Sequence, residues 1–130
     1  MGKRIEVNCT QQIKQIFVTA LRDYTEVAFP PGSADCGLVA REAMLDSLAG
    51  FEREYAANGD GRAGYNKRLR AMAKEAIRLH YRLLAAADGS ARDHECALLL
   101  EVAEGLPHDD ADLEAARAAD RNPGAPSPGA

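Results

Sequence analysis

The stretch YNKRLRAMAKEAIRLHYRLLAAA, residues 65–87, decides the predicted fold. At about 100° per residue, its apolar side chains gather on one side of a helix and its basic side chains on the other. The apolar side holds Tyr65, Leu69, Met72, Ala73, Ala76, Ile77, His80, Leu83 and Leu84. The basic side holds Lys67, Arg70, Lys74, Arg78 and Arg82. This pattern predicts one long amphipathic helix whose basic face points to solvent.

Similar patterns on both sides of this stretch predict further helices. Apolar residues recur every three or four positions over 10–23, 33–55 and 92–104. A short fifth helix is expected from a cap at Asp109 or Asp110 to about residue 119. The glycine-rich residues 58–64 are expected to form a flexible loop, and residues 3–7 a short extended segment. The predicted fold class is all-α, an antiparallel bundle of four main helices plus a short fifth helix.

Length and composition set the outer limits of this prediction. A chain of 130 residues has the size of one domain, and residues 1–120 are predicted to form it. Residues 121–130 are rich in proline and glycine and are predicted to be a disordered tail. The net charge of −4 is a poor match for nucleic acid, so such binding would need a local basic face.

The cysteines and the hydropathy pattern predict a cytoplasmic protein without membrane insertion. Three cysteines lie far apart with no CxxC pair, which is typical of reduced thiols. No window approaches the roughly 18 consecutive apolar residues that a membrane helix needs. Cys36, in the first turn of a predicted helix, could act as a nucleophile with His80 as base, but a small core cysteine is the favoured interpretation.

The basic side of residues 65–87 is the candidate partner-binding surface. Lys67, Arg70, Lys74, Arg78 and Arg82 span roughly 22 Å at 1.5 Å per residue, enough to lie along an acidic protein partner or a phosphate backbone. No aromatic residue interleaves with them, so stacking on bases finds no support. The alternative is an ordinary solvated helix face that neighbours such as Glu75 partly neutralise.

Residues 79–117 carry a distinctive pattern: a helix ending in Ala-Asp-Gly, a Glu seven residues after the Asp, and a helix leading to a Gly-Leu turn and an acidic cap. The residues of this pattern are Ala87, Asp88, Gly89, Glu95, Leu99, Ala103, Gly105, Leu106 and Asp109 or Asp110. In these residues the chain resembles the tellurite-resistance TerB-like helical domains. Ala91, Arg92 and Asp93 depart from the usual link between the two helices.

Asp88 and Glu95 admit two interpretations. Asp88 followed by Gly89 can close one helix, and Glu95 near the start of the next can reach back to its free amide groups. Alternatively, the two carboxylates supply part of a shell for a divalent cation, which needs several oxygen ligands. A divalent cation is the one cofactor that the sequence leaves open.

Together these features predict a non-enzymatic protein-interaction module, and the resemblance implies a place in bacterial stress or phage-related biology. One alternative is a nucleic-acid-binding protein that uses the basic face of residues 65–87. Another is a small phage- or plasmid-encoded inhibitor of a host protein. The expected partner is a protein, and a homodimer is left open.

Overall fold

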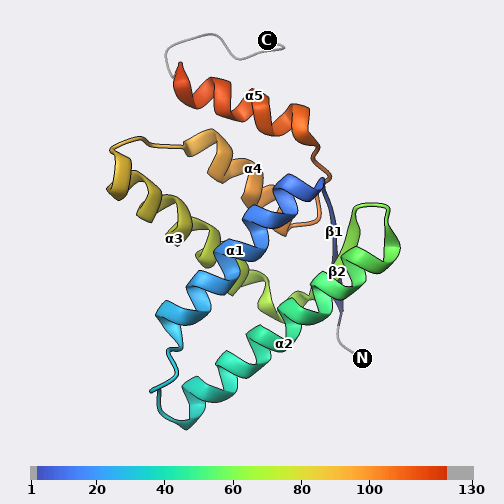
Figure 1. Ribbon diagram of the computed structural model, residues 1–130, viewed down its shortest axis with the longest axis vertical. Coiled ribbons are helices and arrows are strands. Elements are labelled where there is room, and N and C mark those ends of the chain that lie inside the picture. The colour runs from blue at the N-terminus through green and yellow to red at the C-terminus, as the bar shows by residue number, and fades with distance from the viewer. Residues whose placement is uncertain (1–2, 123–130) are drawn as a thin grey trace.

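The structure is a computed structural model, and it describes residues 3–122. In chain order these form β1 (Arg4–Asn8), α1 (Gln11–Ala28), α2 (Asp35–Asn58), β2 (Arg62–Asn66), the 3-10 helix η1 (Lys67–Leu69), α3 (Arg70–Asp88), α4 (Asp93–Ala103) and α5 (Asp110–Arg121). Helices α1 and α2 form a V-shaped hairpin, α1 crosses α3, and α3, α4 and α5 follow one another in a zigzag (Figure 1). The described part of the chain is therefore predominantly helical.

A two-stranded sheet corrects the prediction of a purely all-α fold. β1 and β2 pair antiparallel, with Ile5 opposite Tyr65 and Val7 opposite Ala63. These four side chains point inward and are buried, because alternate residues of a strand face the same side. The expected flexible loop over 58–64 is consequently wrong at its carboxyl end, where the backbone enters this sheet.

The central helix begins at Arg70, five residues later than predicted. Tyr65 belongs to β2, and its hydroxyl donates a 2.6 Å hydrogen bond to the carbonyl oxygen of Ala103 in α4. The Asn66 side chain then accepts a hydrogen bond from the amide of Arg68 and so caps η1. Helical periodicity alone could not reveal this later start of the helix, since Tyr65 faces the core equally well from a strand.

The core is centred on aromatic rings where α1, α2 and β2 meet. The ring of Phe17 lies 5.4 Å from that of Phe51 and 5.9 Å from that of Tyr65, measured between centroids. All three side chains are buried. Leu83, predicted to face the core, is instead 52% exposed. The apolar side of α3 is thus narrower than the sequence indicated.

Gly61, just before β2, contacts Cys9, just after β1. Gly61 has a φ of +80°, a conformation that favours glycine over other residues. A Cβ atom at this position would lie 2.9 Å from the carbonyl oxygen of Cys9. The amide of Cys9 donates to the carbonyl oxygen of Gly61 at 3.0 Å, so the two segments touch directly at the end of the sheet.

The carboxyl-terminal helix begins as predicted. The Asp109 side chain accepts from the amide of Asp112, and the Asp112 side chain accepts from the amide of Asp109. This reciprocal capping box confirms Asp109 as the cap of α5. The helix includes Arg121, the first residue of the predicted tail, and residues 123–130 of that tail lie outside the described residues. Across residues 3–122, none of the helices combines the length and the apolar character that crossing a membrane requires.

Candidate functional site

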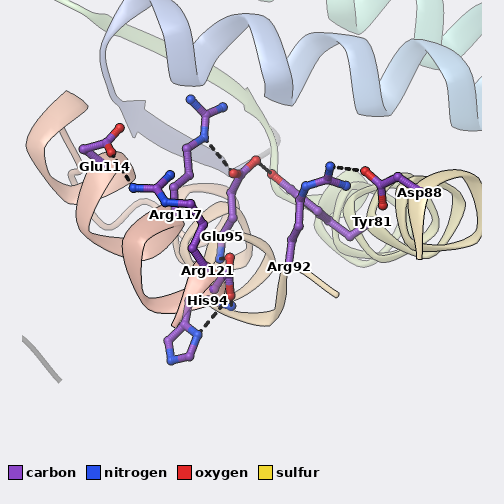
Figure 2. Close-up of polar contacts among 9 residues, drawn as sticks. Tyr81, Asp88, Arg92, His94, Glu95, Glu114, Arg117 and Arg121 are labelled. Atoms are coloured by element: carbon purple, nitrogen blue, oxygen red, sulfur yellow. Dashed lines mark hydrogen bonds and ion pairs between the residues drawn. The ribbon is translucent and has the colours of Figure 1, made fainter. Parts of the chain in front are cut away.

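A buried carboxylate joins three helices at one end of the molecule. Glu95, in the first turn of α4, is only 5% exposed. The Tyr81 hydroxyl of α3 donates to its Oε2 at 2.5 Å, and Nε of Arg117 in α5 donates to its Oε1 at 2.8 Å. Figure 2 shows the three side chains converging from their separate helices. The Glu95 side chain therefore makes tertiary contacts, and the prediction that it reaches back to the free amides of α4 is wrong.

Charge compensation explains why this carboxylate tolerates burial. An ionised carboxylate without partners is costly to bury, whereas one with hydrogen-bonding partners is not. Burial and the hydrogen bond to Glu95 together raise the pKa of Tyr81, so its hydroxyl stays protonated and remains a donor. The same carboxylate raises the pKa of Arg117 through their hydrogen bond. Tyr81, Glu95 and Arg117 form what we call the Glu95 cluster.

The amino terminus of α4 is capped from a distance by α5. Oδ1 of Asp120 accepts from the amide of His94 at 2.8 Å, and its Oδ2 accepts from the amide of Glu95 at 3.0 Å. The Nδ1 atom of His94 also lies 3.0 Å from Oδ1. A helix start leaves such amides unsatisfied, and the residue at the capping position, Arg92, makes no side-chain cap. Asp120 replaces that local cap.

A cavity of about 500 Å³ lies beside the Glu95 cluster. Its walls come from α1, α3, α4, α5 and the link between α3 and α4. They consist of Ile16, His80, Leu84, Ser90, Arg92, Glu95, Arg117, Asp120 and Arg121. This volume falls in the range of about 300–1,000 Å³ that is typical of small-molecule sites. We call it the Glu95 cavity.

In the wall of this cavity, the guanidinium of Arg92 carries hydrogen-bond donors that lack an acceptor among residues 3–122. Its Nη2 atom donates to Asp88 across the link between α3 and α4, as Figure 2 shows. Its Nη1 atom is shielded from solvent and has no hydrogen-bond acceptor among residues 3–122. A buried donor without an acceptor costs free energy, and in native proteins such groups are rare.

The structure places the two predicted metal ligands in separate protein contacts. Oδ1 of Asp88 accepts from the amide of Ser90 and its Oδ2 from Arg92, and these hydrogen bonds lower the pKa of Asp88. Both oxygens of Glu95 accept from protein donors. Within residues 3–122, no three side chains of His, Cys, Asp or Glu are grouped so that they could hold a metal ion. The divalent-cation assignment stays a prediction.

The predicted basic face is present, but three of its five residues form ion pairs with glutamates. Lys67 lies in η1, and the other four residues project from α3. Lys74 and Arg70 both reach Glu104, which directly follows α4, at 2.7 and 3.4 Å, and they lower its pKa. Arg78 pairs with Glu75, one turn away on the same helix, at 3.1 Å. Arg82 makes no ion pair among the residues that the structure describes.

Arg78 and Arg82 border a hollow of about 280 Å³ between α3 and α4. Its lining consists of Arg78, Tyr81, Arg82, Ala85, Ala91, Arg92, Asp93 and Cys96. Three of these residues are cationic and one is anionic, and the remainder offer mostly apolar surface. The carboxyl-terminal part of the predicted basic face therefore forms the rim of a concave surface. We call it the α3–α4 hollow.

The candidate cysteine nucleophile does not meet its candidate base in this cavity. Cys36 is exposed in the first turn of α2, on the hairpin with α1. His80 lines the Glu95 cavity, and Cys36 does not. Burial lowers the pKa of His80, which keeps its imidazole neutral near pH 7. Buried Cys9 is also a poor nucleophile, because burial raises its thiol pKa to about 12.

Sequence reasoning missed most of the residues that build this site. Tyr81 carried a usable signal, because it continues the stripe of Ala73 and Ile77 at intervals of four and is buried with them. Arg117 and Asp120 carried none, since charged residues on a short surface helix are ordinary. Their roles depend on how α5 packs against α4.

No protein-family model matches this chain, and neither a curated protein nor a solved structure was found to match it.

Proposed function

We propose that this protein is a non-enzymatic helical interaction module that binds an acidic segment of a partner protein in the α3–α4 hollow. The observation that supports this most directly is the combination of a concave surface, an apolar floor and a cationic rim made by Arg78 and Arg82. Both side chains are exposed. A segment with acidic residues around one small apolar side chain complements such a surface in charge and shape.

Nucleic-acid binding by the same helix is the less favoured function. Glu104 neutralises Arg70 and Lys74, so the row of cations that a phosphate backbone would follow is interrupted. The whole chain also carries a net charge of −4. A protein partner needs only the local rim and does not depend on the full row.

The resemblance to TerB-like domains extends the proposal to bacterial stress or phage-related biology. Consistent with that pattern, α3 ends at Asp88, and Gly89 follows in the left-handed conformation with a φ of +71°. A phage- or plasmid-encoded inhibitor would use the same kind of surface against a host protein, and a second copy of the chain is a further partner to consider. On this proposal the protein works in the cytoplasm.

Affinity capture with charge-reversed variants tests the proposal. The wild-type chain and the double variant Arg78→Glu with Arg82→Glu would be immobilised and exposed to nuclease-treated host lysate. The matched control reverses two exposed arginines elsewhere, Arg53→Glu with Arg62→Glu. We expect a defined protein to be retained by the wild type and the control and lost by the first variant.

Two results would count against it. Identical sets of captured proteins from all three baits would remove the α3–α4 hollow as the partner surface. Retention that is seen only when the nuclease is left out, with a steep dependence on salt, would favour nucleic acid instead.

A further inference from the structure

We infer that the Glu95 cavity binds a small organic anion with a carboxylate or phosphate group at one end and an apolar group at the other. This site shares Arg92 with the α3–α4 hollow but differs from it in its other residues and in its ligand, and it does not depend on the proposed function. The inference starts from the hydrogen-bonding groups in the cavity wall.

The polar wall holds more hydrogen-bond donors than the protein's own acceptors use. A guanidinium carries five N–H donors, yet Arg92, Arg117 and Arg121 each donate to a single carboxylate within residues 3–122. The two carboxylates in the wall are already engaged, because both oxygens of Glu95 and both oxygens of Asp120 accept from protein donors. A ligand that supplies acceptor oxygens therefore fits this wall, and an ammonium ion does not.

One of these unused donors can be assigned to a specific atom of Arg92. Its Nη1 atom is the one buried side-chain nitrogen or oxygen among the described residues without a hydrogen-bond partner. Arg92 lines the cavity, and its planar guanidinium fork is suited to bind a carboxylate or phosphate there. The neighbouring hydroxyl of Ser90 lines the same wall and adds a further donor.

The ion pair of Arg121 is weak enough for a ligand to compete with it. Arg121 donates to Glu114 at 3.0 Å, and their side chains are 61% and 67% exposed. Exposed pairs of this kind contribute little to stability. A bound oxyanion can therefore recruit Arg121 from the rim of the cavity without breaking the Glu95 cluster.

The apolar end of the ligand follows from the opposite part of the cavity. Ile16 and Leu84 line it, and Leu84 and His80 also line an adjoining hollow of about 180 Å³ between α1 and α3. The other walls of that hollow are Ala20, Asp23, Tyr24, Ala76, Leu79 and Leu83. Because burial lowers the pKa of His80, the imidazole that lines both spaces is uncharged near neutral pH. Within residues 3–122, Asp23 is then the one charged residue in the lining of this hollow, and we assign the apolar end of the ligand to its apolar part.

Calorimetric titration of the full chain with hexyl phosphate tests the inference. Hexanoate carries the alternative oxyanion, hexanol lacks the charge, hexylamine reverses it, and inorganic phosphate lacks the apolar chain. We expect hexyl phosphate or hexanoate to bind at least about tenfold more tightly than each of the last three compounds. The tighter of the two oxyanions identifies the head group.

Two single substitutions with opposite expected effects locate the binding site. Arg121→Gln should weaken binding of hexyl phosphate about tenfold, because it removes a charged donor. Glu114→Gln should tighten it, because Arg121 is then free. Arg53→Gln, on the exposed side of α2, is the matched control and should leave the affinity unchanged. All three positions are exposed, so the fold should survive each change, which circular dichroism checks.

The inference is overturned by any of three results. One is the absence of binding by hexyl phosphate and hexanoate up to about 10 mM, weaker than specific ligand sites usually are. Another is equal or tighter binding of hexylamine. The third is an affinity for hexyl phosphate that Arg53→Gln changes as much as Arg121→Gln does.

Discussion

Replacing Arg117 by methionine should destabilise the protein, because the carboxylate of Glu95 then stays buried without its charged partner. The side chain of Glu95 is 7% exposed, and Arg117 is its charged partner. In the variant, the carboxylate keeps the Tyr81 hydroxyl as a donor but loses the positive charge. Methionine retains much of the length of the arginine stem, so the change isolates the loss of charge from the loss of packing.

The expected cost follows from the burial of the two partners. Removing one member of a fully buried ion pair costs about 3–5 kcal/mol, because the other charge stays buried without compensation. The side chain of Arg117 is 32% exposed, so water already screens part of this interaction. We therefore expect a loss of about 2–3 kcal/mol in the free energy of unfolding. For a chain of this size that corresponds to a fall in Tm of roughly 8–12 °C.

Urea unfolding followed by circular dichroism measures this loss, and a double-mutant cycle identifies its cause. If the buried charge is responsible, Glu95→Gln should recover part of the stability that Arg117→Met removes, so the two changes should not add. Arg53→Met, on exposed α2 surface, should change the free energy by less than about 0.5 kcal/mol. Strict additivity in the cycle, or an Arg117→Met variant as stable as Arg53→Met, would refute the reasoning.

Three further predictions use the same unfolding assay. Tyr81→Phe removes a donor to buried Glu95 and should cost about 2 kcal/mol, so an unchanged midpoint would contradict the role of the hydroxyl. Burial lowers the pKa of His80 in the folded chain, so on acidification this imidazole is protonated at a higher pH in the unfolded chain than in the folded one. The free energy of unfolding therefore falls as the pH drops below about 6.5. The variant His80→Gln should therefore lose less stability than the wild type between about pH 7.5 and 5.5, and parallel pH profiles would disprove this. Gly61→Ala should lower the free energy of unfolding by about 1–3 kcal/mol, because residue 61 has a φ of +80° and the alanine Cβ would lie 2.9 Å from a carbonyl oxygen. The control variant Gly32→Ala has open space around the new methyl group and should leave the stability almost unchanged.

The helices could be predicted because each buries one side against the rest of the chain. Periodicity placed the ends of α1, α2, α3 and α4 to within about five residues, and the acidic residues Asp109 and Asp110 located the start of α5. Local patterns of this kind depend on neighbours within about one turn. They do not require knowledge of which helices touch.

The sheet and the Glu95 cluster depend instead on residues far apart in the sequence. Residues 62–66 became a strand because residues 4–8 lie alongside them, and Gly64 within that segment resembles a loop residue when the sequence is considered alone. Glu95 could be recognised as a capping candidate, but its contact with Arg117 arises only from the packing of α4 on α5. Pattern analysis therefore found the carboxylate and missed the partner that allows its burial.

The distant cap on α4 also bears on how the chain reaches its final state during synthesis. A nascent chain that has emerged only as far as residue 109 contains all of α4, but it lacks both the carboxylate of Asp120 and the guanidinium of Arg117. The amides at the start of α4 therefore gain their hydrogen-bond acceptor only after α5 has been synthesised. Their exchange with solvent should be controlled by detachment of α5, so that the two helices open as one cooperative unit.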